Sequence, residues 1–221
     1  RDLHLSIRRQ RQMCIRDRVN SPNMFVSVAM LGIAQSGYLP LKRSTANVGD
    51  MIGITGNLGC SAGGMQAMND DSVIGKEILT HLTKAHNRPI PRIKQGAILT
   101  QNGCSAAMDI SDGLIKDLKT MCRASNVGAT IVLESVPVDR YLIDAYPETY
   151  LSLALSGGED YELLFTAPPE AMSKIESLVD IKTSVIGKVV KSPATVSVTD
   201  KSGRTLPLNY SGWTHFGNNQ P

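Results

Sequence analysis

Apolar and polar residues alternate along this chain in blocks that predict strands and helices in turn. Short apolar runs bounded by glycine, serine or proline predict strands, and apolar residues gathered on one helical face predict helices. The predicted strands cover residues 24–34, 51–55, 130–133, 161–166, 185–189 and 195–198. The predicted helices cover residues 70–86, 114–124, 138–154 with an interruption at Pro147, and 169–179. This mixture predicts a layered α/β or α+β domain from about residue 45 onward, and of the two we expect α+β.

Composition supports a globular protein whose body has no basic bias. The chain has 221 residues, of which 42% are hydrophobic, enough for one or two domains with a core. Its formal net charge of +3 is uneven, because residues 1–18 carry six arginines and two aspartates and the rest of the chain carries net −1. We therefore expect no nucleic-acid partner. The segment MCIRDR within residues 1–18 resembles translated sequencing-adapter read-through, so we expect these residues to be a non-native leader.

Cysteine spacing and hydropathy add two expectations about location. No apolar run approaches the roughly 20 residues that cross a membrane, so no membrane partner is expected. The cysteines are widely spaced and form no C-x-x-C pair, which is typical neither of a zinc motif nor of a disulfide framework. Reduced thiols in the cytoplasm are the simplest interpretation. These cysteines are Cys14, Cys60, Cys104 and Cys122.

The segment Asp109-Ile110-Ser111-Asp112-Gly113 is the most informative motif of the chain. An apolar run precedes it and an amphipathic helix follows it, so it is predicted to lie where a strand becomes a helix. Carboxylates suit Mg²⁺, and the amides at a helix start suit phosphate. Serine and aspartate are also common as plain helix caps, and spacing alone favours that alternative.

The glycine-rich segment Gly56–Gly64 opens a predicted helix, and two interpretations are open for it. Its backbone amides could hold phosphate, although the Lys-Ser/Thr ending of a P-loop is absent. With equal weight, its glycines could serve close packing of a helix on a strand.

Two further features have both a ligand-binding and a structural interpretation. In Ser156–Asp160, two glycines precede Glu159 and Asp160, so the backbone could approach a ligand that a carboxylate then binds, or the segment could be a charged surface turn. Arg43 could pair with a nucleotide phosphate, but a solvated loop arginine is the favoured alternative.

Four strings in this order resemble one family: GDMIGITGNLGCSAGGM, RPIPRIKQG, AAMDISDGLIKDL and LALSGGEDYELLFT. The resemblance is to thiamine-monophosphate kinase, of the aminoimidazole-ribonucleotide-synthetase-like superfamily, and runs from about Met24 to Phe216. It implies a layered α/β/α C-terminal domain preceded by the last strand of an N-terminal ATP-binding domain. By this resemblance, residues 19–44 are a remnant of that first domain, residues 45–217 are the C-terminal domain, and residues 218–221 are a tail.

The same resemblance implies roles for particular residues. The Mg²⁺ ligands would be Asp109 and Asp112, the ATP contacts Ser111 and Arg43, and the thiamine phosphate contacts Glu159 and Trp213. An aromatic face at Trp213 would suit the cationic thiazolium ring. Phosphoryl transfer depends on positioning and charge neutralisation, so no protein nucleophile is expected.

The implied activity is ATP-dependent phosphorylation of thiamine phosphate to thiamine diphosphate, with Mg²⁺ and ATP as a co-substrate, in an enzyme that is a homodimer at full length. The family's aspartate-rich N-terminal domain is not represented in these residues, so we expect a truncated form that is inactive alone. Two alternatives are a non-enzymatic ligand-binding fragment and another ATP-using member of the superfamily.

Overall fold

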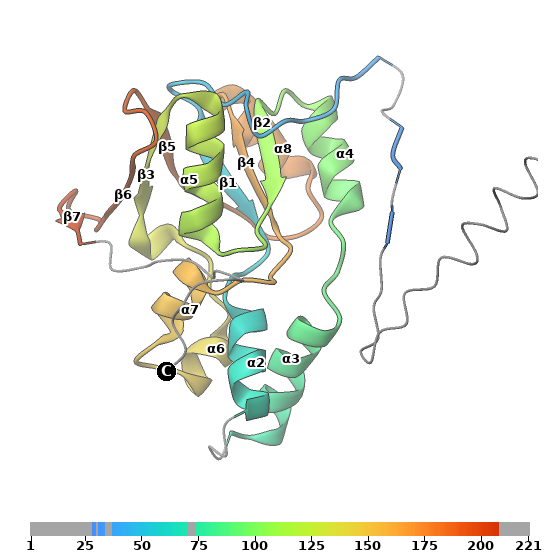
Figure 1. Ribbon diagram of the computed structural model, residues 1–221, viewed down its shortest axis with the longest axis vertical. Coiled ribbons are helices and arrows are strands. Elements are labelled where there is room, and N and C mark those ends of the chain that lie inside the picture. The colour runs from blue at the N-terminus through green and yellow to red at the C-terminus, as the bar shows by residue number, and fades with distance from the viewer. Residues whose placement is uncertain (1–27, 30, 34–36, 70–73, 208–221) are drawn as a thin grey trace, which may run out of the picture. The chain divides into compact units, whose positions relative to one another are not determined.

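The computed structural model describes residues 28–29, 31–33, 37–69 and 74–207 (Figure 1). The chain divides into two units, Arg1–Ala34 and Gln35–Pro221. In the first unit, the described residues of the predicted strand 24–34 have no regular secondary structure, so that prediction is wrong for them. Their apolar side chains are exposed, and a strand needs a neighbouring strand to bind its backbone. The predicted leader 1–18, the tail 218–221 and Trp213 lie outside the described residues.

A mixed sheet forms the centre of the second unit (Figure 1). Its strand order is β2-β4-β1-β5-β3-β6-β7, and every neighbouring pair is antiparallel except β3 with β6. The strands are β1 (Met51–Thr55), β2 (Ala106–Asp109), β3 (Gly128–Val132), β4 (Leu163–Ala167), β5 (Thr183–Val190), β6 (Val196–Thr199) and β7 (Thr205–Leu206). The predicted α+β class is confirmed.

Helices cover both faces of this sheet. Helix α5 (Leu114–Ser125) packs on one face, whereas α4 (Ile93–Gln101) and α8 (Pro169–Leu178) share a buried cluster on the other. Successive residues of β4 show the two faces, because Leu164 belongs to the cluster of α5 and Phe165 to the cluster of α4 and α8. This is the layered arrangement that the sequence predicts.

A second group of helices lies beyond one end of the sheet (Figure 1). It consists of α2 (Cys60–Asn69), α3 (Lys76–Asn87), α6 (Arg140–Ala145) and α7 (Tyr150–Ser156). The helical stretch predicted over residues 138–154 with an interruption at Pro147 is two helices, with Pro147 between them, so the predicted interruption is confirmed. The predictions did not include α4, β7 or the short 3₁₀ helix Leu133–Ser135. No helix in the described ranges is long and apolar enough to cross a membrane.

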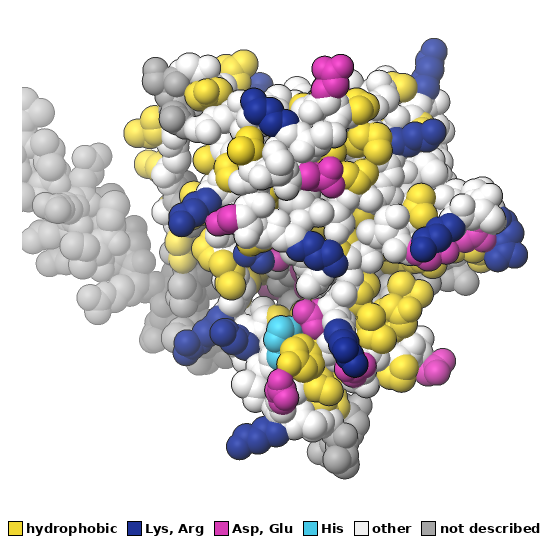
Figure 2. Space-filling view, turned by 180° about the vertical axis from the view of Figure 1, so that it is seen from behind, with side chains coloured by type: hydrophobic (Ala, Val, Ile, Leu, Met, Phe, Trp, Pro, Cys, Tyr) yellow, Lys and Arg dark blue, Asp and Glu magenta, His cyan; other side chains and the backbone are white. Residues whose placement is uncertain are grey.

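The face of this unit that Figure 2 presents carries charges of both signs. Lysine and arginine side chains are interspersed there with aspartate and glutamate side chains.

Candidate functional site

The two motif turns, 109–113 and 156–160, dock against each other through their backbones. The amide of Glu159 donates to the carbonyl of Ser111 at 2.9 Å, and the amide of Tyr161 donates to the carbonyl of Ile110 at 2.9 Å. The amide of Ile110 in turn donates to the carbonyl of Glu162 at 2.8 Å. These bonds continue the antiparallel pairing of β2 with β4 into the turns. Two segments far apart in sequence therefore form one structural unit.

Glycines make this docking possible. Gly113 has φ of +106°, and a Cβ atom there would lie 2.6 Å from the carbonyl oxygen of Ser156. A Cβ atom at Gly158 would lie 2.5 Å from the carbonyl oxygen of Ser111. Real Cβ atoms do not approach so closely, so each turn has glycine where the backbone of the other passes.

Asp117, in the first turn of α5, holds the turn 109–113 in shape. Its Oδ2 accepts hydrogen bonds from the amides of Ser111 at 3.0 Å and Asp112 at 2.9 Å. Burial raises the pKa of this carboxyl, the two amides oppose that effect, and the charges of Asp112 and Asp109 add to it. The sequence analysis did not identify Asp117, although an acid in the first turn of a helix is a signal for binding helix-start amides.

The side chains of Asp109 and Asp112 do not hold the turn in shape as Asp117 does, so they remain available for a ligand. Asp109 is exposed at the end of β2, and the half-buried Asp112 pairs with Lys116 at 2.8 Å. Burial and the hydrogen bond to Glu159 raise the pKa of Tyr161, and the charges of Asp109 and Asp112 add to that effect. The cap alternative fails for these side chains, because the N-cap of α5 is Gly113 and the turn amides bind Asp117 instead. Two accessible carboxylates fit Mg²⁺, which takes one or two together with phosphate oxygens and water.

Asp160 connects the turn 156–160 to the glycine-rich segment. Its carboxylate accepts from the amides of Gly59 at 2.7 Å and Ser61 at 3.2 Å, at the start of α2. Burial raises the pKa of Asp160 from 3.8 to about 7, against the effect of these two amides and with a contribution from the charge of Glu162. The sequence analysis assigned Asp160 no such role.

The glycine-rich segment packs rather than presenting amides to phosphate. Two amides of the segment bind Asp160. In addition, the amide of Gly56 donates to the backbone carbonyl of Lys182, and the amide of Leu58 donates to the backbone carbonyl of Pro137. A Cβ atom at Gly64 would lie 2.1 Å from the carbonyl oxygen of Leu82, where α2 crosses α3. The structure therefore shows close packing for this segment, but Gly64 allows one helix to pack on another and not, as predicted, a helix to pack on a strand.

A buried ion pair supports the start of β4. Arg92 donates through Nε and Nη2 to the carboxylate of Glu162, with the Nε bond at 2.7 Å. Thr55 also donates to Glu162 at 2.7 Å, and its hydroxyl accepts from the amide of Leu163. The hydrogen bond to Glu162 raises the pKa of Arg92. Three hydrogen bonds thus hold the Glu162 carboxylate in place.

A pocket of about 450 Å³ opens beside the docked turns and is largely apolar in its lining. Ser111 and Glu159, two predicted ligand contacts, both line it. Glu159 has φ of +69°, uncommon for a residue with a side chain, and its Oε2 accepts from the hydroxyl of Tyr161 at 3.0 Å. The pocket is lined by Ala62, Met65, Gln66, His86, Ser111, Leu153, Ser156, Gly157, Gly158 and Glu159.

Three other predicted site residues do not line this pocket: Arg43, Asp109 and Asp112. Arg43 is exposed in a turn, where its backbone carbonyl accepts from the hydroxyl of Ser125 at 3.0 Å. Asp109 lines a different hollow, together with residues such as Leu41 and Met108. The structure therefore brings Ser111 and Glu159 together but does not bring Arg43 or Asp109 into the same pocket.

Known proteins resemble most of this chain. The thiamine-monophosphate kinase of Buchnera aphidicola subsp. Schizaphis graminum is 35% identical over 202 residues, which are 89% of this chain and 62% of that protein. The crystal structure of thiamine-monophosphate kinase from Stenotrophomonas maltophilia K279a matches with a TM-score of 0.64 and 30% identity, over 72% of this chain and 52% of that one. The structure of AaThiL complexed with AMPPCP and TMP matches with a TM-score of 0.68 and 30% identity, over 80% of this chain and 54% of that one.

These matches confirm the resemblance predicted from the sequence motifs. They also show that the resemblance covers only part of each relative. The chain spans about three fifths of the length of the curated relatives, 62% for the Buchnera protein. The family described as AIR synthase related protein, C-terminal domain, matches residues 47–200. This range includes both docked turns, the glycine-rich segment and the pocket lining. The chain therefore belongs to the AIR synthase related proteins, of which it contains the C-terminal domain.

Proposed function

We propose that the protein phosphorylates thiamine phosphate to thiamine diphosphate at the expense of ATP. The observation that carries this proposal is the docking of turns 109–113 and 156–160, after which Ser111 and Glu159 line one pocket. Support comes from relatives that are thiamine-monophosphate kinases and from the AaThiL structure, complexed with AMPPCP and TMP.

Each predicted residue has a role in this proposal. The apolar pocket binds the flat rings of thiamine phosphate, with Glu159 facing a cationic or amino-bearing part of the molecule. Ser111 and Arg43 contact the nucleotide, and Trp213 contributes an aromatic face for the thiazolium ring. Asp109 and Asp112 hold Mg²⁺, which neutralises phosphate charge when bound. The chain supplies no nucleophile, because the acceptor phosphate is itself the attacking group.

The same proposal includes the location, the oligomeric state and the partners of the enzyme. The enzyme acts in the cytoplasm as a homodimer at full length, on small molecules, and uses neither a nucleic acid nor a membrane. For these residues alone we predict ligand binding without turnover. A reacting pair held by part of a site loses positional advantage, which is worth up to about 7–11 kcal/mol in well-oriented cases. Losing half of that slows turnover by several powers of ten.

The test is a fusion in which the N-terminal part of the Buchnera relative precedes residue 45. We expect it to form thiamine diphosphate from ATP, Mg²⁺ and thiamine phosphate, and we expect Asp112→Asn to lower turnover about a hundredfold or more, as loss of one electrostatic contact to developing charge does. The matched control is Asp144→Asn, an exposed acid on α6 that should leave the rate unchanged. A fusion that folds but forms no product, or an Asp112→Asn variant at the parental rate, would contradict the proposal.

A further inference from the structure

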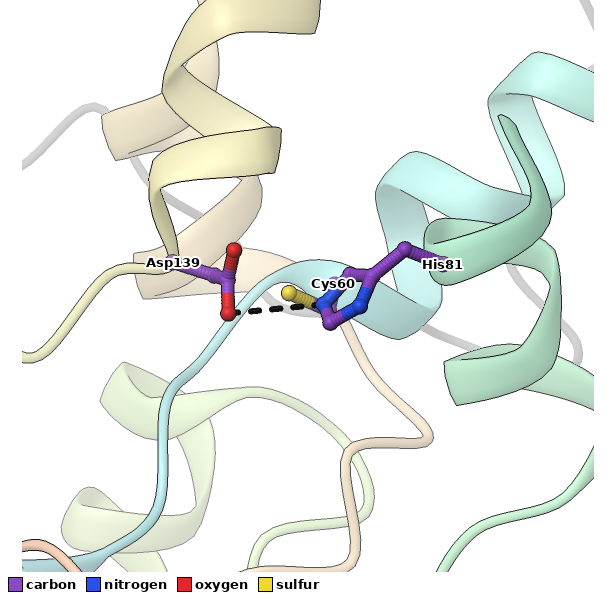
Figure 3. A group of neighbouring side chains, drawn as sticks. All are labelled: Cys60, His81 and Asp139. Atoms are coloured by element: carbon purple, nitrogen blue, oxygen red, sulfur yellow. Dashed lines mark ion pairs between the residues drawn. The ribbon is translucent and has the colours of Figure 1, made fainter. Parts of the chain in front are cut away.

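A second pocket, of about 290 Å³, contains three side chains that offer metal-ligand atoms. They are Cys60 at the start of α2, His81 on α3 and Asp139 at the N-cap of α6, and their ligand atoms all lie within 4.8 Å of one another (Figure 3). Among the residues that the structure describes, no other group of three or more histidine, cysteine, aspartate or glutamate side chains meets this distance. The kinase proposal uses none of the three.

The surrounding structure orients two of these donors. Asp139 Oδ1 accepts from the amide of Tyr141 at 2.8 Å, which leaves Oδ2 directed at His81, with Nε2 at 3.4 Å. The His81 ring lies 4.6 Å from the ring of Tyr141, centroid to centroid. Secondary contacts of this kind fix carboxylate and imidazole ligands in metal sites.

An unsatisfied polar atom lies at the same place. Asn57 lines the pocket and donates through Nδ2 to Asp139 Oδ2 at 3.4 Å. Its Oδ1 is buried and has no hydrogen-bond partner. A buried oxygen without a hydrogen-bond partner costs folding free energy. A metal ion or a metal-bound water at this place would interact with the oxygen and remove that cost.

The acidic side chains around the Cys60 thiol favour the binding of a cation. The carboxylates of Asp139, Asp160 and Glu162 line the same pocket as Cys60. The basic residues that line the pocket are Lys84, Arg88 and Arg92. Lys84 and Arg88 are exposed and screened by water, and Arg92 is paired with Glu162.

We propose that Cys60, His81 and Asp139 bind a divalent transition-metal ion of the Zn²⁺ type, with Asn57 Oδ1 or a water as the fourth donor. One sulfur, one nitrogen and one oxygen form a donor set that suits Zn²⁺ and not the hard ion Mg²⁺. On binding, the thiol proton passes to solvent and a sulfur–metal bond forms. The ion connects α2, α3 and α6, so its role is to stabilise this group of helices.

The test is a titration of the metal-free full chain with Co²⁺. We expect one ion to bind, with a thiolate-to-cobalt charge-transfer band and the intense visible bands of a tetrahedral site, and we expect Zn²⁺ to displace it. Zn²⁺ should also raise the melting temperature. Cys60→Ser should abolish the charge-transfer band, and His81→Gln should weaken binding at least tenfold, as loss of a contact to the metal does.

Matched controls come from residues of the same types. Cys104→Ser, Cys14→Ser and His86→Gln should keep the band and the affinity of the parent chain. His81 is partly exposed, so His81→Gln should fold even if Cys60→Ser does not, and circular dichroism checks both. Absence of a thiolate band in the parent chain, a band that survives Cys60→Ser, or parental affinity in His81→Gln would overturn the proposal. None of these outcomes depends on kinase activity.

Discussion

The turns 109–113 and 156–160 use their acidic residues in the same two ways. Near each turn, one carboxylate binds two backbone amides: Asp117 binds those of Ser111 and Asp112, and Asp160 binds those of Gly59 and Ser61. Each turn also keeps at least one acid that binds no such amide, Asp109 at the first turn and Glu159 at the second. Burial and hydrogen bonding, not residue type, thus distinguish a carboxylate that holds the fold from one that is available to a ligand.

The docking of the turns should be the feature most sensitive to mutation. Gly113→Ala forces a left-handed conformation on alanine and places its Cβ against the carbonyl of Ser156, so we expect a loss of about 3 kcal/mol or more in unfolding free energy. Gly203→Ala is the matched control, because φ there is also positive but nothing lies near the new Cβ, and it should cost only about 1 kcal/mol. Urea denaturation of both variants measures the difference. Equal losses would mean that the close approach of the turns contributes nothing.

Asp117, in α5, and Asp112, in the turn 109–113, should differ clearly in their contributions to stability. Asp117→Asn removes the charged acceptor of two amides, so we expect it to cost about 1–3 kcal/mol. Asp112→Asn breaks only a half-exposed pair with Lys116, so the cost should be a few tenths of a kcal/mol. Denaturation midpoints of the two variants test this order, and the reverse order would refute the division into structural and ligand-binding acids.

Asp160, in the second turn, should make the unfolding free energy of the chain depend on pH. Its pKa is raised in the folded state from 3.8 to about 7, so its contribution to stability is complete below about pH 4 and is lost as pH rises through about 7. Asp160→Asn does not titrate, so the fall in unfolding free energy between pH 4 and 7 should be smaller in this variant than in the parent chain. Parallel pH profiles would show that burial does not perturb Asp160.

The smallest effect on stability is expected at Glu159. Its side chain contacts the hydroxyl of Tyr161 near the surface, and glutamine can accept the same bond. Glu159→Gln should therefore change the unfolding free energy by less than about 0.5 kcal/mol. It should still weaken thiamine phosphate binding, measured by calorimetry. A variant that binds as the parent does would exclude Glu159 from the ligand site.

The sequence predicted the main elements but not the partners of the buried acids. Runs such as 51–55 and 114–124 carry enough apolar periodicity to identify β1 and α5. Helix α4 was not predicted, because prolines precede it, Gly96 interrupts it, and only Gln95 and Leu99 are buried along it.

The sequence motifs predicted which segments form the candidate site. They did not predict which residues contact one another there. The motifs identified both turns, but the bond from Asp160 to the amides of Gly59 and Ser61 joins residues about a hundred positions apart. Nothing local in either segment signals it. For the same reason, cysteine spacing could not indicate that Cys60 lies beside His81 and Asp139. Such contacts exist only once the helices pack.

The most direct test of a single binding site formed by both turns is a ¹H–¹⁵N spectrum of the chain titrated with thiamine phosphate. We predict that the amides of Ser111, Gly158 and Glu159 shift together with the same apparent affinity, along with those of pocket residues on α2 such as Met65. Shifts confined to one turn, or shifts that avoid both, would contradict the account.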